Sequence, residues 1–143
     1  DPFKHINDTY GHVIGDKVLK AVGSVLLGEI RSTDIPVRYG GEEFVIFMPM
    51  QTVEAGVQFA ERLRQKIEKI KFLSTDKKKR FSVTISVGVA SHQQKESLQK
   101  LIQRADEKMY QAKDSGRNKV CVASVDKSKI EQKIASKEKV VST

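Results

Sequence analysis

The chain has 143 residues, of which 38% are hydrophobic and 31% are charged, with only three prolines and nine glycines. This balance is typical of one globular domain and excludes a disordered or collagen-like chain. The single cysteine, Cys121, excludes an internal disulfide framework, and no apolar run reaches the roughly 18 residues that a membrane span needs.

The net charge of +8 is concentrated in one stretch of the chain. Between Arg62 and Arg80 there are nine basic and two acidic residues, so this stretch alone carries +7. Such a run is usually the solvated back of a helix followed by a basic loop. Of the tyrosines and phenylalanines only Phe72 lies within this stretch, whereas base stacking would require several interleaved aromatic residues, so no nucleic-acid partner is expected.

The first third of the chain predicts a helical segment and a hairpin. Residues 2–15 indicate a short helix followed by a loop. From Asp16 onward, apolar residues recur at helical spacing, which predicts a helix that Asp16 caps and that ends near Gly28. Short strands are expected over 35–39 and 43–48, joined by a turn in which the Gly-Gly pair supplies positive φ.

The rest of the chain predicts two longer helices and two strands. Thr52 and Ser97 are expected to cap the helices, and Gly116 is expected to stop the second one. Between the helices, residues 81–90 alternate apolar and small side chains, which predicts a strand whose small-residue face can lie close to a helix. A last strand is expected over 119–122.

This order of elements predicts an α+β fold in which helices flank a mixed, mainly antiparallel sheet. We expect a domain over residues 1–124 and a basic C-terminal tail over 125–143. The sequence opens inside what looks like a functional loop, with no strand before it, so we expect an N-terminally truncated fragment of a longer protein.

Gly40-Gly41-Glu42-Glu43 is a candidate site at the expected hairpin tip. Residues without side chains let a bulky anion approach the backbone, and Mg²⁺ is bound by one or two carboxylates together with phosphate oxygens. An ordinary polar turn with solvated glutamates explains the same residues equally well from local evidence.

Two further polar clusters have the chemistry of a nucleotide site. The first, which offers the donors and acceptors of a guanine edge and a cation for phosphate, consists of Lys4, Asn7, Asp8, His12 and Asp16. The second is the pair Lys113 and Arg117, which flanks Gly116. At a helix C-terminus these cations would also complement the helix dipole, so a purely structural role remains open.

Four motifs follow one another along the chain. They are Asp-x-Phe-Lys-x-Ile-Asn-Asp-x-x-Gly-His-x-x-Gly-Asp over 1–16, Arg-Tyr-Gly-Gly-Glu-Glu-Phe over 38–44, Ser-Val-Gly-Val-Ala over 86–90, and Ala-Asp-x-x-Met-Tyr-x-Ala-Lys-x-x-Gly-Arg-Asn over 105–118. In this order they resemble the GGDEF family of diguanylate cyclases. The resemblance implies a ferredoxin-like, nucleotidyl-cyclase-type fold and a cytoplasmic domain, with membrane attachment of the parent protein left open.

The resemblance also implies an activity. Family members condense two GTP molecules into cyclic di-GMP and release two pyrophosphates, across a homodimer in which each domain holds one GTP. It implies Mg²⁺ or Mn²⁺ as cofactor and an upstream sensory domain in the parent chain. The family pattern places a further metal-binding Asp two residues before the position of Asp1, outside this sequence.

The resemblance implies a role for each residue of this sequence that matches a functional position of the family motifs. Glu42 would bind the metal and is the position proposed as the base toward the ribose 3′-hydroxyl, Glu43 would support the metal site, and Lys4 would neutralise the phosphates. The implied substrate-binding residues are Phe3, Asn7, His12, Asp16, Gly40, Gly41, Lys113 and Arg117.

Arg31-Ser32-Thr33-Asp34 resembles the family's Arg-x-x-Asp site for product inhibition by cyclic di-GMP. Locally, the same two residues could form an ordinary surface ion pair. The alternative to an enzyme is a non-catalytic module that senses GTP or, through Arg31 and Asp34, cyclic di-GMP.

Overall fold

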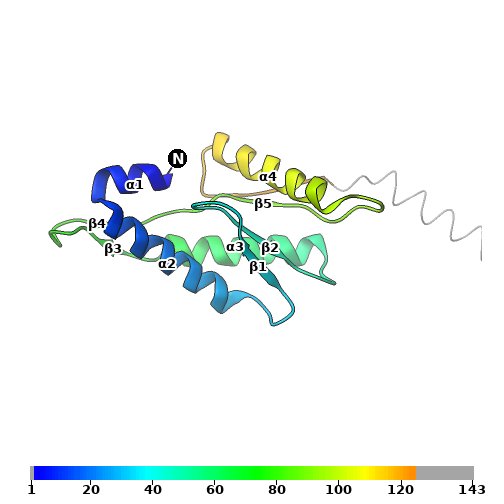
Figure 1. Ribbon diagram of the computed structural model, residues 1–143, viewed down its shortest axis with the longest axis horizontal. Helices are drawn as coiled ribbons and strands as arrows, with labels where there is room; N and C mark the ends of the chain where they lie inside the picture. Colours follow the sequence, from blue (N-terminus) through cyan, green and yellow to red (C-terminus); the bar gives the residue numbers. More distant parts are fainter. Residues whose placement is uncertain (1, 125–143) are drawn as a thin grey trace, which may run out of the picture.

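The structure is a computed structural model in which residues 2–124 are described (Figure 1). The predicted tail over 125–143 lies outside the described residues, so the predicted domain boundary stays a prediction. Among the described residues, no helix has both the length and the apolar character needed to cross a membrane.

The N-terminal segment folds as two consecutive helices, α1 (Pro2–Tyr10) and α2 (His12–Glu29). Gly11 separates them with φ of 85° and is the N-cap of α2, with no side-chain capping bond. The prediction that Asp16 caps the helix is therefore wrong, and so is the loop predicted around His12. Because the positive φ of Gly11 turns the chain within one residue, α2 begins four residues before Asp16.

Strands β1 (Ile35–Arg38) and β2 (Phe44–Phe47) form the predicted antiparallel hairpin, with Ile35 opposite Phe47 and Arg38 opposite Phe44. The Tyr39 N–H donates to the Glu43 carbonyl at 2.9 Å and closes the turn. The expected positive φ of the Gly-Gly pair is wrong, because the positive-φ glycines of the described chain are Gly11 and Gly116.

The two longer helices begin where their capping residues predict. Thr52 Oγ1 accepts from the Ala55 N–H at 3.1 Å at the start of α3 (Val53–Glu68). Ser97 Oγ accepts from the Lys100 N–H at 3.2 Å at the start of α4 (Leu98–Asp114). Each side chain satisfies a backbone donor that the first helical turn leaves without an intrahelical partner, so both caps are confirmed.

The strand predicted over residues 81–90 is split. Its first residue belongs to β4 (Arg80–Phe81), which pairs antiparallel with β3 (Phe72–Leu73). Its end forms β5 (Val87–Val89), which pairs parallel with β6 (Val120–Val122). Residues 82–86 have no ladder partner in the described part of the chain. Strand β3 was not predicted, since two residues are too few for an alternating pattern.

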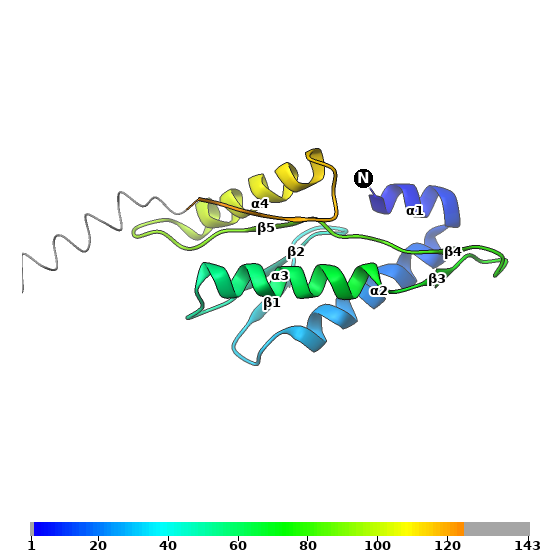
Figure 2. The same cartoon turned by 180° about the vertical axis from the view of Figure 1, so that it is seen from behind.

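The helices lie on both sides of the β5–β6 pair. Helix α4 packs on one side of the pair and α3 on the other, α2 packs against α3, and α1 packs against α2 (Figures 1 and 2). The main core lies between α2 and α3, where the buried residues are Ile6, Ile14, Val18, Val22, Leu26, Phe59, Leu63 and Ile67. Two antiparallel pairs, one parallel pair and flanking helices confirm the predicted α+β class.

An aromatic stack joins the β3–β4 hairpin to the end of α1. The Tyr10 and Phe81 rings are stacked, with centroids 4.1 Å apart and planes 6° apart, and Phe72 stacks on Phe81 at 5.6 Å. The basic loop predicted over 76–80 connects the strands of this hairpin, with exposed lysines. The stack therefore fixes a charged hairpin against the helix that carries Lys4 and Asn7.

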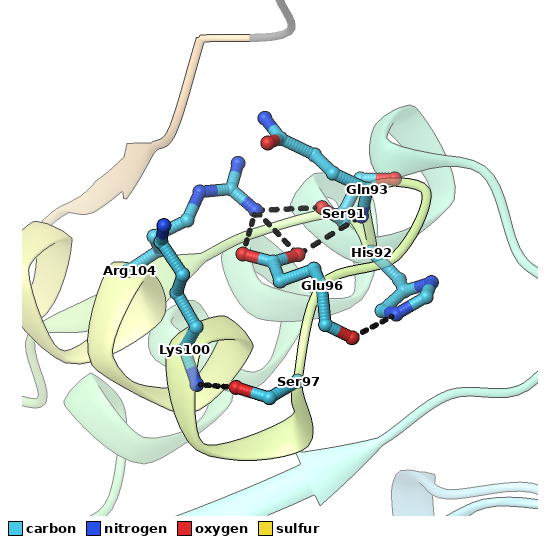
Figure 3. Close-up of polar contacts among 7 residues, drawn as sticks. All are labelled: Ser91, His92, Gln93, Glu96, Ser97, Lys100 and Arg104. Carbon is cyan, nitrogen blue, oxygen red and sulfur yellow. Dashed lines mark hydrogen bonds and ion pairs between the residues drawn. The ribbon is translucent and has the colours of Figure 1, made fainter.

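The loop between β5 and α4 is held by a buried carboxylate (Figure 3). The Glu96 side chain is 4% exposed and accepts from the Gln93 N–H at 2.9 Å and from Arg104 Nη1 at 3.0 and 3.1 Å. Arg104 also donates to the Ser91 carbonyl at 2.9 Å. The Gln93 hydrogen bond lowers the pKa of Glu96 below its ordinary value of 4.5, burial opposes this, and Arg104 lowers the pKa further.

Helix α4 lies against β5 without room for a side chain at Gly88. A Cβ at this position would lie 1.9 Å from the Ala105 carbonyl oxygen and 2.4 Å from the Met109 nitrogen. These atoms belong to the helix backbone and cannot rotate away. The small-residue face predicted for this strand therefore does pack closely on a helix.

Gly88→Ala is expected to force α4 away from β5 and to lower the free energy of unfolding by about 3 kcal/mol or more, because overpacking at backbone contacts cannot relax locally. Gly23→Ala is the matched control, since a Cβ there meets nothing within 4 Å. In the middle of α2 it should stabilise by up to about 1 kcal/mol. Denaturant midpoints measure both changes, and equal midpoints for the two variants would contradict the close approach.

Glu96→Gln is expected to lower the melting temperature by several degrees at about pH 7. Because the folded-state pKa of Glu96 is depressed, its stabilisation is present above the unfolded-state pKa and is lost as the pH falls through the folded-state pKa. The difference between wild type and Glu96→Gln should thus shrink in a melting series from about pH 7 to about pH 3. Glu107→Gln, at an exposed position, is the control, and a pH-independent difference for Glu96→Gln would refute the role of the charge.

Candidate functional site

A cleft of about 700 Å³ opens between the hairpin, α3, the 84–92 segment and α4. Its apolar floor includes side chains from β2, α3 and the segment before β5, among them Phe44, Ile46, Phe59, Leu63 and Ile85. Of the residues predicted to form the site, it brings together Phe3, Glu42, Glu43, Lys113 and Arg117. These residues come from three segments that are far apart in sequence, so the cleft is the candidate site.

The hairpin tip supplies the carboxylates of the cleft. Glu42 and Glu43 are both half-buried, and Arg38 Nη2 donates to the Gly41 carbonyl at 2.6 Å across the turn. A Cβ on Gly41 would meet nothing within 4 Å, and one on Gly40 only the Glu43 Cβ at 3.9 Å. With no positive φ and no packing contact at either position, the fold of the described chain does not require glycine there. The bare backbone instead leaves space beside two carboxylates.

The end of α4 supplies the cations. Lys113 is half-buried, with its Nζ 5.5 Å from the centre of the Tyr110 ring, and Arg117 is exposed in the turn after the helix. The Arg117 N–H donates to the Ala112 carbonyl at 2.9 Å, which ties this turn to the last helical carbonyls. The cations therefore share the cleft with the hairpin carboxylates and can neutralise an anionic ligand there.

The residues predicted around α1 and α2 divide into two groups. Phe3 lines the cleft, whereas Lys4, Asn7, His12 and Asp16 are not among its lining residues. Asn7 packs directly on α2, because a Cβ on Gly15 would lie 1.8 Å from Asn7 Oδ1. His12 and Asp16 are exposed and one helical turn apart. Gly40 and Gly41 also lie outside the lining residues.

The acidic residues of the cleft suit one kind of metal ion. Within residues 2–124 there is no group of three or more His, Cys, Asp or Glu side chains that could hold a metal. Two neighbouring carboxylates do fit Mg²⁺, which keeps several waters and takes its other ligands from substrate phosphates. A Zn²⁺ site would need three or four protein ligands. The donor set at Glu42 and Glu43 thus fits a metal that arrives with a phosphorylated ligand.

Arg31 and Asp34 form a hydrogen-bonded ion pair at the opposite end of the hairpin. The Asp34 side chain is 1% exposed, and it accepts from Arg31 Nη2 at 2.9 Å and from the Arg31 N–H at 2.8 Å. Burial raises the pKa of Asp34, but the two hydrogen bonds from Arg31 outweigh it and hold the pKa below its usual range. Arg31 also donates to the Pro49 carbonyl at 3.3 Å, which connects the pair to the end of β2.

One charged residue of the cleft had no role in the sequence predictions. Asp106 lines the cleft from α4, on the same helical face as Met109 and Lys113. The signal was its spacing of seven residues from Lys113, which places both residues on one face two turns apart. His92 also lines the cleft, and its Nε2 lies 2.9 Å from the Glu96 carbonyl oxygen (Figure 3).

The chain is similar to proteins of one family. The family model described as "Diguanylate cyclase, GGDEF domain" matches residues 1–119. The response regulator PleD of Caulobacter vibrioides is 45% identical over 121 residues, which are 84% of this chain and 27% of PleD. Diguanylate cyclase A of Treponema denticola is 42% identical over 124 residues, which are 86% of this chain and 33% of that protein. The chain therefore spans about a third or less of these relatives.

The fold has the same relatives as the sequence. The crystal structure of the GGDEF domain of DgcB from Caulobacter crescentus, in complex with c-di-GMP, superposes with a TM-score of 0.81 at 32% identity. The match covers 85% of this chain and 72% of that one. It bears out the predicted nucleotidyl-cyclase-type fold. With a family model that matches most of its length, the chain belongs to the GGDEF domain family of diguanylate cyclases.

Proposed function

We propose that this chain is the catalytic domain of a diguanylate cyclase that condenses two GTP molecules into cyclic di-GMP and releases two pyrophosphates. The observation that carries the proposal is the cleft in which Glu42 and Glu43 share one space with Lys113 and Arg117. The relatives agree with this proposal, since one is named diguanylate cyclase A and one solved GGDEF domain is in complex with c-di-GMP.

Two bonds are made and two are broken in this reaction. The 3′-oxygen of each GTP attacks the α-phosphorus of the other, and the bond from that phosphorus to the bridging oxygen of pyrophosphate breaks. The hydroxyl proton passes to a base, for which Glu42 is the candidate, and pyrophosphate leaves with the bonding electrons. Because the product is symmetric and one domain holds one GTP, two copies of the domain must face each other.

The protein's part in phosphoryl transfer is to position the reactants and to stabilise charge. Lys113 and Arg117 would hold the terminal phosphates of the bound nucleotide through charge-assisted hydrogen bonds. Lys4 would neutralise phosphate from α1, and the bare backbone at Gly40 and Gly41 would let the phosphates lie against the hairpin. Phe3 would contact the substrate from the cleft wall.

Glu42 and Glu43 would hold Mg²⁺ or Mn²⁺ together with the substrate phosphates. When bound, such an ion supplies Lewis-acid stabilisation of phosphoryl oxygens. The nucleoside would be bound by Asn7, His12 and Asp16, with Asn7 and Asp16 toward the guanine. Asn7 is held in place on Gly15, so its carboxamide is positioned before the ligand arrives.

Arg31 and Asp34 would form a second, regulatory site for cyclic di-GMP. Their ion pair is already formed, and the Arg31 side chain is 46% exposed, so its guanidinium can donate further hydrogen bonds to a phosphate or a guanine. The alternative function is a non-catalytic module that senses GTP or cyclic di-GMP. An apolar residue two positions before Asp1, where the family pattern has a metal-binding Asp, would favour this alternative.

Glu42→Gln is expected to lower kcat for cyclic di-GMP formation by at least about 100-fold, because the variant keeps the shape of the side chain but removes its charge and basicity. The assay incubates the protein, expressed from its complete reading frame, with GTP and Mg²⁺ and separates the nucleotides by chromatography. Glu107→Gln on the exposed side of α4 should leave kcat unchanged. Full activity in Glu42→Gln would refute its role. A wild-type protein without product that still binds cyclic di-GMP would favour the sensing alternative.

Arg31→Ala is expected to weaken cyclic di-GMP binding by at least about tenfold, since a charge-assisted hydrogen bond is lost. It should also relieve inhibition by added product. Titration calorimetry measures the affinity, and initial rates with increasing cyclic di-GMP measure the inhibition. Arg80→Ala, at an exposed position on β4, is the control. Undiminished inhibition in Arg31→Ala would place product inhibition elsewhere.

A further inference from the structure

The turn that presents Arg117 has an unusual backbone. Gly116, Arg117 and Asn118 follow one another with φ of 112°, 61° and 47°. Left-handed backbone is accessible to Gly and tolerated by Asn, but it is strained at Arg. Something outside the turn must therefore hold Arg117 in this conformation.

A polar network from α3 meets the turn at Asn118. Asn118 Oδ1 accepts from Arg64 Nη1 at 2.8 Å, and Asn118 Nδ2 donates to Glu68 Oε1 at 2.8 Å. Arg64 is itself held by Glu61 at 3.0 Å and by Glu68 at 3.2 Å, and its side chain is only 16% exposed. Both ends of the carboxamide are thus engaged by residues 50 and 54 positions away.

Only a carboxamide fits between these two partners. Its oxygen faces a guanidinium that can only donate, and its nitrogen faces a carboxylate that can only accept. An aspartate at this position would place a second carboxylate against Glu68. A left-handed Asn with both ends bonded therefore fixes the direction of the turn relative to α3.

The network does not itself reach the ligand space. Arg117 lines the cleft, whereas Arg64, Glu68 and Asn118 are not among its lining residues. Any effect of these three residues on a ligand must pass through the turn. The Arg117 N–H bond to the Ala112 carbonyl, at 2.9 Å, fixes the same turn from the α4 side.

We propose that Arg64, Glu68 and Asn118 are positioning residues that hold Arg117 toward the phosphates of the bound nucleotide. The inference rests on the proposed function, in which Arg117 binds the terminal phosphates. It assigns a role in nucleotide affinity to residues on the back of α3. Because this phosphate contact is present in both bound substrate and transition state, loss of positioning should raise KM more than it lowers kcat.

The test is Asn118→Gly in the protein expressed from its complete reading frame. Glycine keeps the left-handed backbone without strain and removes only the carboxamide. The KM for GTP should rise about tenfold while kcat changes less than about threefold, as expected for a lost phosphate contact. Lys108→Ala, on α4 and outside the cleft lining, should change neither value.

A double-mutant cycle separates positioning from general destabilisation. If Asn118 acts through Arg117, Asn118→Gly should change KM less than about twofold in an Arg117→Ala background. An equal rise in KM in both backgrounds, or no rise in wild type, would overturn the proposal. If Asn118→Gly fails to fold, Arg64→Gln removes the same hydrogen bond from the α3 side and is expected to give the same pattern.

A second readout keeps this inference separate from the proposed activity. Binding of a GTP analogue that cannot be condensed, with Mg²⁺ present, should weaken about tenfold in Asn118→Gly and in Arg117→Ala. Weakened binding in both variants, in a protein that makes no cyclic di-GMP, would uphold positioning and refute the cyclase. Normal binding of the analogue by Arg117→Ala would overturn the inference. It would leave the proposed cyclase activity untouched, which the Glu42→Gln assay tests separately.

Discussion

The contact between helix α4 and strand β5 at Gly88 determines where the cations of the site lie. The helix backbone approaches the strand so closely that a single methyl group would collide with the Ala105 carbonyl and the Met109 nitrogen. Since an α-helix is a stiff rod with a rise of about 1.5 Å per residue, fixing α4 at these residues also fixes its C-terminal end. That end carries Lys113 and the turn with Arg117. One missing side chain in β5 therefore sets the position of two charges more than a helical turn away.

The glycines of the hairpin tip, unlike Gly88, are not required by packing. Gly88 is required by packing and Gly116 adopts a positive φ, but Gly40 and Gly41 have neither positive φ nor close neighbours. Glycine in such a position lowers stability slightly, because the unfolded chain gains conformational freedom. Folding alone gives Gly40 and Gly41 no function, whereas a ligand that occupies the space beside their backbone would give them one. The backbone and packing of the tip are therefore those expected of a binding element.

Features set by neighbouring residues could be predicted, and features set by distant ones could not. Thr52 and Ser97 each cap a helix through a hydrogen bond from the backbone N–H three residues later. The β1–β2 hairpin has a connection of five residues. The caps and the hairpin therefore follow from the local sequence. The predicted Asp16 cap is wrong because Gly11 starts the helix earlier. Residues 82–86 have no ladder partner among the described residues, because strand pairing depends on a neighbouring strand. The bonds from Asn118 to Arg64 and Glu68 join residues 50 or more positions apart, for which one sequence carries no periodic signal. Five residues that the motifs and the family resemblance assign to the site do line the cleft, whereas their roles stay a prediction.

The two proposed nucleotide sites lie at opposite ends of one hairpin, and this limits how they can communicate. Asp34 precedes β1 and Gly40 follows it, six residues later. At about 3.3 Å per extended residue, the two positions are separated by roughly 20 Å along the strand. The β1–β2 ladder between these positions is short and regular, and it has no bulge at which the strand register could change when product binds. If the reaction takes place between two facing domains, as proposed, product bound at Arg31 and Asp34 would act more readily by restraining how the domains approach each other than by reshaping Glu42 through the strand.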